Sequence, residues 1–475
     1  MKPTRTDTQS AFRALPSVDE VLRLTGVRAL ATRVDAALLA AFVAQVVDGW
    51  RAEIRDGLLS ADELAVRLMQ NVHVRAVESL VAREERAGVR RCVNATGVVL
   101  NTGLGRAPVH HEAAAAMAEA AASYCVLEVD RESGERNQRD ARLAELVSRL
   151  TGAEAAIAVN NNAAAVFLVL QTFAAGKEAI VSRGELVEIG GSFRVPDVMK
   201  RANARLVEVG TTNRTRLSDY AAAIVTSTGL LMKVHTSNFR VVGFTEEVSP
   251  AELAELGRAR NVPTAFDLGS GLLECDGAPP LAERLGGEPL VRSAVQSDVD
   301  VVTFSADKLL GAPQAGVIVG KRAAVRALRD NPIYRALRLD KVALAGLEKT
   351  CELLLAGRGG EIPARAMLAL SAQDLEPAAR ALAAAVSRID GYAADVVPGR
   401  SEPGSGSAPG VFLPTFVARV RHRALRASAL AAALRRASVP AFVRVHEDAV
   451  LCDPRTLLAG DAELLVRAFA EAAGS

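Results

Sequence analysis

Lys308 is the residue of this chain whose surroundings most favour covalent chemistry. It follows the apolar segment VDVVTFS and precedes GAPQAGVIVG, in which glycine and proline mark a turn before a second apolar segment. Both segments have the length and composition of buried strands, so we expect Lys308 to leave a turn between them. Burial lowers the pKa of a lysine and supplies the neutral amine needed to form an imine. Taken alone, the segment is explained better by a strand-end lysine whose stem is buried and whose amine reaches water.

Asp267 ends another apolar segment, PTAFDLGSG, about forty residues before Lys308. A carboxylate in this position can be a turn or cap residue. In a site that binds pyridoxal phosphate, a carboxylate faces the pyridine nitrogen and keeps it protonated, so that the ring accepts electrons. A lysine and a carboxylate at two strand ends therefore point to this cofactor.

Further polar residues at strand ends fit the same site. Asn160, Asn161 and Asn162 stand between the segment AAIAVN and a helical pattern, and free N–H groups at a helix start bind phosphate. A plain helix cap explains one of these asparagines better than it explains three. Ser305 is close enough to Lys308 in sequence to donate to the same phosphate. His235 follows a strand and is a candidate to lie against the cofactor ring, although a buried structural histidine is the commoner case.

The strands and helices needed to bring these residues together begin at about residue 91. Short apolar strands alternate with helices there, which predicts a mainly parallel sheet covered on both faces. The predicted strands are 155–160, 178–182, 204–210, 229–237 and 262–271. Ligands bind such sheets beyond the carboxyl ends of the strands, where Lys308, Asp267 and His235 occur.

The two ends of the chain have other textures. Residues 1–90 have helical periodicity, and Ser60 is a plausible start of a capping box. Residues 397–410, VPGRSEPGSGSAPG, are rich in proline, glycine and serine and predict a mobile connection. Alternating strands and helices after it predict a small α+β unit.

Composition excludes several classes of protein. Half of the 475 residues are hydrophobic, which argues against a mainly disordered chain, and 57 basic against 55 acidic residues give no nucleic-acid or membrane signal. No apolar run approaches the roughly 20 residues of a membrane-spanning helix. The five cysteines form no CxxC pair, and there is no HExxH, GxSxG, dinucleotide or P-loop motif. We expect a soluble cytosolic protein with reduced thiols and no metal.

Seven longer segments are familiar as a set. They are NATGVVLNTGLGRAP (94–108), SRGELVEIGGSFRVPDVM (182–199), VGTTNRT (209–215), KVHTSNFRVVGFTEEV (233–248), DLGSGLL (267–273), SADKLLGAPQAGVIVG (305–320) and PIYRALRLDK (332–341). In them the chain resembles bacterial selenocysteine synthases, the L-seryl-tRNA(Sec) selenium transferases. The segments cover about 91 to 350 and are long enough to be specific.

This resemblance implies the aminotransferase-like (fold type I) architecture of pyridoxal-phosphate enzymes, with the cofactor on Lys308. It implies conversion of seryl-tRNA(Sec) to selenocysteinyl-tRNA(Sec) for selenoprotein synthesis, through an aminoacrylyl intermediate, with Lys308 as the base for the α-proton. Selenophosphate is the implied selenium donor. The family places arginines at the positions of Arg106, Arg335 and Arg338, and arginine suits such a polyanion. Arg335 and Arg338 are three apart, so we expect one helical face to present both.

The resemblance also implies an organisation for the whole molecule. We expect a helical segment over 1–90 that helps to select tRNA, a catalytic core over 91–345, and a linking helix with a small α+β domain over 346–475. A cytoplasmic homo-oligomer built from dimers, a decamer in this family, is implied as well. The 13 basic and 12 acidic residues of 1–90 lend tRNA binding no electrostatic support.

Departures from the family leave two alternatives open. Residues 124–140 keep only part of the family's glycine and arginine pattern, and SEPGSGSAPG replaces a more glycine-dense loop. The first alternative is a related pyridoxal-phosphate lyase that acts on a small amino acid or an amino-sugar acid phosphate, but such relatives generally lack a long helical segment before the core. The second is a non-catalytic tRNA-binding protein, against which the presence of Lys308, Asp267 and the asparagines together argues.

Overall fold

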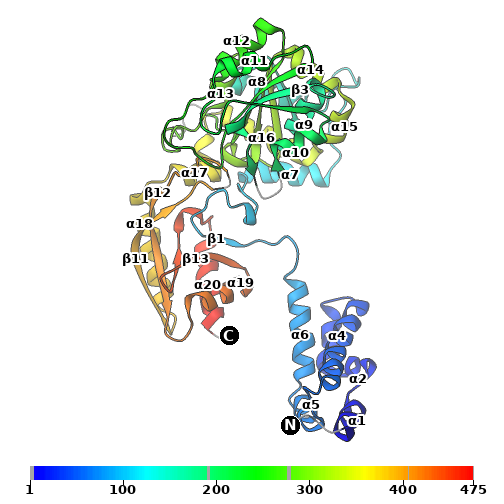
Figure 1. Cartoon of the computed structure of the whole chain (residues 1–475). Helices are drawn as coiled ribbons and strands as arrows, with labels where there is room; N and C mark the ends of the chain where they lie inside the picture. The colour runs from blue at the N-terminus through cyan, green and yellow to red at the C-terminus, as the bar shows by residue number, and fades with distance from the viewer. Residues whose placement is uncertain (1–4, 190–192, 275–279, 405, 474–475) are drawn as a thin grey trace. The chain divides into compact units, whose positions relative to one another are not determined.

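The chain forms two compact units, Met1–Arg91 and Cys92–Ser475. A computed structural model describes residues 5–189, 193–274, 280–404 and 406–473, and Figure 1 shows them coloured from the N-terminus to the C-terminus. Each unit has hydrophobic cores of its own, so each is described by itself.

The first unit is helical, as the periodicity predicted. Its helices are α1 (Arg5–Ala14), α2 (Val18–Arg23), α3 (Thr25–Arg28), α4 (Ala36–Arg55), α5 (Ala61–Met69) and α6 (Val72–Glu85). Valines of α4 and α6, among them Val43 and Val77, are fully buried against each other. The predicted capping box is confirmed, because the Ser60 hydroxyl accepts from Glu63 N while the Glu63 carboxylate accepts from Ser60 N at 2.9 Å.

A seven-stranded sheet forms the centre of the second unit. Its strands, in spatial order, are β2 (Ala155–Val159), β10 (Gly316–Gly320), β9 (Val301–Ser305), β8 (Thr264–Gly269), β7 (Thr228–Val234), β3 (Glu178–Ser182) and β6 (Arg205–Val209). The pairs from β9 to β6 are parallel, and β10 is antiparallel to both neighbours. The predicted mainly parallel sheet is therefore confirmed, and β9 and β10 are joined through the turn that carries Lys308.

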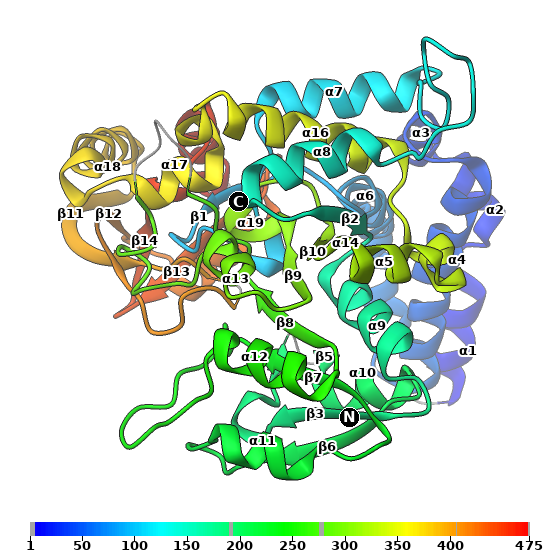
Figure 2. The same cartoon turned by 90° about the horizontal axis from the view of Figure 1, so that it is seen from above.

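Helices cover both faces of this sheet. On one face α8 (Ala141–Thr151), α13 (Val291–Gln296) and α16 (Lys341–Leu355) pack on alternate side chains of β9 and β10. On the other face α9 (Asn162–Phe173), α10 (Val195–Arg201) and α14 (Arg322–Asp330) pack on the remaining ones. Helices α7 (His111–Ala122), α16 and α8 lie side by side in Figure 2.

A second sheet of five strands forms near the C-terminus, in the order β1 (Val93–Ala95), β13 (Ala441–His446), β14 (Ala449–Cys452), β12 (Leu413–His422) and β11 (Tyr392–Ser401). Helices α18 (Ala372–Ser387), α19 (Ala427–Arg436) and α20 (Asp461–Ala473) bury their apolar sides against it. The first strand of the unit thus pairs in parallel with a strand 348 residues later, Val93 with Ala441.

The prediction of a mobile connection over 397–410 was wrong for its first part. Residues 397–401 belong to β11 and pair with β12 as far as Ser401 and Leu413. Pro398 is compatible with a strand here because β11 is at the edge of the sheet, where the missing N–H leaves no neighbour unpaired. After the strand, Glu402 forms a parallel bridge with Val98, and the Gly406 carbonyl lies 3.4 Å from Lys308 Nζ.

A buried arginine joins this sheet to the rest of the unit. Arg455 is 1% exposed, and its guanidinium donates to the carbonyls of Met367 and Leu370 at 2.8 Å and to the Ser401 hydroxyl at 2.8 Å. Burial lowers the pKa of Arg455 to about 10, with the nearby Asp453 acting in the opposite direction. The contact fixes the end of β11 from which the segment to Lys308 departs.

Within the described residues, no helix is both long and apolar enough to cross a membrane.

Candidate active site

Lys308 lies in a buried turn between two central strands. The short helical turn Ala306–Leu310 follows β9, and Lys308 itself departs from helical geometry, with φ −110° and ψ −115°. The residue is 4% exposed, and its Nζ lies 3.4 Å from the carbonyl oxygen of Gly406. Burial lowers the pKa of Lys308 below its usual value, with the charge of Asp267 opposing the shift and that of Arg106 adding to it. The amine is thereby biased toward its neutral, nucleophilic form.

Asp267 lies within β8, the strand paired with β9, two residues before the strand ends at Gly269 and not at its last position as expected. Its carboxylate is 5% exposed and is held by Asn162 Nδ2 at 2.8 Å and by the Thr303 hydroxyl at 2.9 Å, both on Oδ1. Burial raises the pKa of Asp267, while those two hydrogen bonds and the charge of Lys308 act against the rise. A cationic N–H placed against this carboxylate would stabilise its ionised form.

The three asparagines have different hydrogen-bond partners. The Asn161 side chain caps α9 by accepting from Ala164 N at 2.9 Å. The Asn162 Nδ2 donates to Asp267, and its buried Oδ1 has no hydrogen-bond partner in the described ranges. Asn160 is exposed, and its carbonyl accepts from Gln314 at 3.4 Å. Ser305 ends β9 and is 6% exposed.

His235 directly follows β7, and its backbone N–H donates to the backbone carbonyl of Asp267 at 2.8 Å. Its ring nitrogen Nε2 is buried and lies 3.6 Å from Oε1 of Glu288. His235 and Glu288 line a hollow of about 850 Å³, and Ser237 lines another of about 210 Å³ with residues of the 402–412 segment.

The interior around Lys308 holds polar atoms that have no partner among the described residues. They are Asn162 Oδ1, His235 Nε2, Ser237 Oγ, Ser270 Oγ, Glu288 Oε1 and Ser407 Oγ. Buried polar atoms in native proteins are nearly always satisfied, so such a cluster indicates a polar ligand. Together with Lys308, whose pKa is lowered, and the buried carboxylate of Asp267, this set of donors and acceptors fits pyridoxal phosphate.

The three arginines predicted to bind selenophosphate have different surroundings. Arg106 has a positive φ of 64°, and its guanidinium pairs with Asp307, the residue before Lys308, at 2.5 Å. Arg338 lies 3.5 Å from Glu128, and Arg335 is exposed, with no ion pair among the residues the structure describes.

The expected common helical face for Arg335 and Arg338 is wrong. The helix α15 (Pro332–Leu337) ends before Arg338, whose backbone is extended, with ψ 148°. The Arg338 N–H still closes the last turn on Tyr334, and its backbone bridges to Val159 of β2. Formation of that bridge requires the chain to leave the helix.

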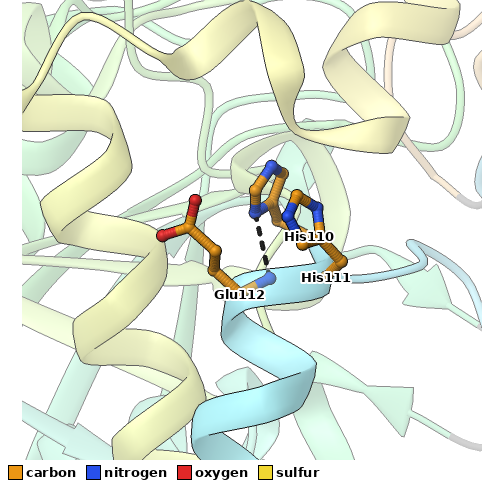
Figure 3. A group of neighbouring side chains, drawn as sticks. All are labelled: His110, His111 and Glu112. Carbon is orange, nitrogen blue, oxygen red and sulfur yellow. Dashed lines mark hydrogen bonds between the residues drawn. The ribbon is translucent and has the colours of Figure 1, made fainter.

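One group of potential metal ligands was not singled out from the sequence. His110, His111 and Glu112 lie together at the start of α7 (Figure 3). The His110 Nδ1 accepts from Glu112 N at 3.2 Å, so this ring caps the helix, and the Glu112 carboxylate pairs with Arg358 at 2.8 Å. An acceptor nitrogen in use and a carboxylate already paired with a cation describe a helix cap rather than a metal site.

Sequence reasoning missed three contributors to the site. Thr303 supports Asp267 from the middle of β9, Glu288 faces His235, and Gly406 brings its carbonyl to Lys308. The alternation of β9 carried a signal for Thr303, since side chains two apart share a face with Ser305. Glu288 and Gly406 come from irregular segments distant in sequence, and neither has a motif.

Comparison with known proteins decides the family. Residues 92–458 match the model of the L-seryl-tRNA selenium transferase family. The chain belongs to this family. An L-seryl-tRNA(Sec) selenium transferase of Moorella thermoacetica is 44% identical over 98% of both chains, and one of Nitratidesulfovibrio vulgaris is 47% identical over 94% of this chain and 95% of the relative.

The fold is shared more widely than the family. A solved D-glucosaminate-6-phosphate ammonia-lyase is 23% identical, covers 82% of this chain and 97% of its own, and superposes with a TM-score of 0.56. The expected aminotransferase-like α/β fold of pyridoxal-phosphate enzymes is thus confirmed. The identity of nearly half over almost the full length places the chain with the transferases rather than with the lyase alternative.

Proposed function

We propose that this chain converts seryl-tRNA(Sec) to selenocysteinyl-tRNA(Sec), with selenophosphate as the selenium donor and pyridoxal phosphate as the cofactor. The observation that carries the proposal is the pairing of buried Lys308 with buried Asp267 in a chain that matches the transferases over 98% of its length. The reaction replaces the serine hydroxyl by selenium and requires the serine α-proton to leave and return.

The contacts of Asp267 support the assignment of a cofactor site to these residues. Lys308 would bind it covalently, and Asp267 would face its pyridine nitrogen, with the carboxylate oriented by Asn162 and Thr303. When bound, pyridoxal phosphate supplies an electron sink for the electrons released from the α-carbon. The start of α9 with Asn161, together with Ser305, offers donors for its phosphate, and the ring of His235 would pack against its plane.

The chain itself would handle protons and anions. Lys308 Nζ, whose pKa burial lowers, would take the α-proton and later return it. Arg106, Arg335 and Arg338 would bind selenophosphate, because guanidinium groups donate in pairs to tetrahedral oxyanions. Asp307, which directly precedes Lys308 in the sequence, pairs with Arg106 and so fixes the position of that guanidinium.

Larger features belong to the same proposal. Residues 1–91 would select tRNA(Sec), since they form a separate helical unit with its own core. RNA of this kind is recognised by shape and a few arginines, so near neutrality of the unit is no obstacle. We further propose a cytoplasmic homo-oligomer built from dimers, up to a decamer.

Replacement of Lys308 tests the chemical centre of this proposal. Wild-type protein loaded with pyridoxal phosphate should show a visible absorption band, and borohydride should fix the cofactor on the peptide that contains Lys308. Lys308→Ala should lose the fixed label, whereas Lys200→Ala, at an exposed position, should keep it. Label on another peptide in both variants would contradict the assignment.

A further inference from the structure

Glu288 carries a buried carboxylate that is only half satisfied. Its side chain is 2% exposed, Oε2 accepts from Ala408 N at 3.2 Å, and Oε1 has no hydrogen-bond partner within the part of the chain that the structure describes. A buried charged oxygen without a partner is costly, because the group has given up its hydration. An unsatisfied atom of this kind in a folded protein calls for a functional explanation.

The unpaired oxygen faces a second unpaired atom, Nε2 of His235, at 3.6 Å. This separation is slightly too long for a hydrogen bond, and a small approach would create a charge-assisted one. The backbone N–H of His235 donates to the backbone carbonyl of Asp267 at 2.8 Å. The Glu288–His235 pair therefore lies at the edge of the lysine–aspartate site.

The other oxygen of Glu288 reaches the segment that passes Lys308. Ala408 N donates to it, and two residues earlier the Gly406 carbonyl lies 3.4 Å from Lys308 Nζ. Gly406 has a φ of +66°, and a Cβ added to it would lie 3.8 Å from the same Nζ, at van der Waals distance. A single carboxylate thus joins the end of β7 to the segment at the lysine.

We propose that Glu288 is a positioning residue that orients the His235 ring and holds residues 406–410 against Lys308. With the Nε2 proton directed to Glu288, the other ring nitrogen is left as an acceptor, so one tautomer is selected. In this role Glu288 acts through its contacts with His235 and Ala408. The inference rests on the proposed cofactor site but does not depend on which substrate that site takes.

Two substitutions separate this role from simple filling of space. Glu288→Gln keeps the shape and an acceptor for Ala408 N but removes the charge that faces His235. Glu288→Ala removes both contacts. Glu283→Ala, on an exposed glutamate of the same segment, is the matched control.

The readouts are hydrogen exchange of residues 406–410 in the full-length protein, pyridoxal-phosphate affinity, and visible circular dichroism of the loaded protein. Glu288→Ala should raise exchange of the segment and weaken cofactor binding by about tenfold or more each. Glu288→Gln should keep exchange within about twofold of wild type but change the circular dichroism band, because the His235 ring loses its anionic partner.

Some results would overturn the inference. One is a Glu288→Ala protein that matches Glu283→Ala in exchange and affinity. Another is a Glu288→Ala protein that is merely less stable, with Glu288→Gln showing the wild-type band. Failure of the wild-type protein to take up pyridoxal phosphate would instead refute the cofactor assignment. The exchange measurement needs no cofactor and would still decide whether Glu288 holds residues 406–410.

Discussion

At the scale of single residues, the site depends on one carboxylate and the two groups that hold it. Asp267 is buried, and Asn162 and Thr303 stabilise its carboxylate because both donate to Oδ1. Asn162 belongs to the first turn of α9, and Thr303 belongs to β9, the strand paired with the one that carries Asp267. These two hydrogen bonds fix the orientation of the carboxylate and do not involve Lys308.

Asp267→Asn should reduce conversion of seryl-tRNA by about 100-fold, since an amide cannot stabilise a protonated pyridine nitrogen as a carboxylate does. The rate is measured in single turnover with saturating pyridoxal phosphate. Asp298→Asn, at an exposed position, serves as the control and should keep the wild-type rate. A wild-type rate for Asp267→Asn would remove the carboxylate from the mechanism.

At the scale of elements, the sequence predicted the strands that carry the site but not the strands and segments that pair with or approach them. Short apolar segments predicted Lys308, Asp267 and His235 at strand ends. In the structure His235 and Lys308 follow β7 and β9, whereas Asp267 lies within β8, two residues before its end. Strand β11 was missed because Pro398 and Gly399 resemble a linker, and only its pairing with β12 makes it a strand. Propensity is a weak guide where tertiary pairing decides.

The same limit applies to the site. Glu288 and Gly406 approach Lys308 from irregular segments, and their positions follow from packing rather than from local sequence. Arg338 leaves the expected helix because its backbone bridges to β2. Periodicity reports neither kind of long-range contact.

Helix α16 gives a test of stability against pH. Burial, helped by the charge of Glu352, raises the pKa of Glu348 from 4.5 to about 6. The folded state therefore binds more protons than the unfolded state between these values, and stability falls as the pH rises through that window.

Glu348→Gln should then raise the free energy of unfolding at pH 7 by about 1 kcal/mol, a value discounted for the partial exposure of the group. The gain should fade below pH 4.5, where both states of the wild type are protonated. Urea unfolding at the two pH values measures it, with Glu119→Gln on the exposed side of α7 as the control. A loss of stability at pH 7 would contradict the assigned cause.

At the scale of the whole molecule, the chain consists of a helical unit and a cofactor-type core with separate hydrophobic interiors. The core has the fold found in an ammonia-lyase, whereas the match to the transferases extends over 98% of the chain. The helical unit is therefore the part to which we assign the RNA specificity.

Removal of residues 1–91 should separate the two activities. The remaining chain should bind pyridoxal phosphate with an affinity within about threefold of wild type, because none of the site residues is removed. Binding of tRNA(Sec), measured by filter retention at fixed salt, should weaken by about 100-fold or more. Undiminished tRNA binding by the shortened chain would assign recognition to the core instead.

The most direct test of the function is conversion of radiolabelled seryl-tRNA(Sec) by the cofactor-loaded protein, with and without selenophosphate. Seryl-tRNA(Ser) and the Lys308→Ala protein are run in parallel. We predict that selenocysteinyl-tRNA forms only from the dedicated tRNA, and only when selenophosphate and Lys308 are both present. Protein that holds its cofactor yet leaves both tRNAs unchanged would contradict the transferase function and favour a lyase acting on a small molecule.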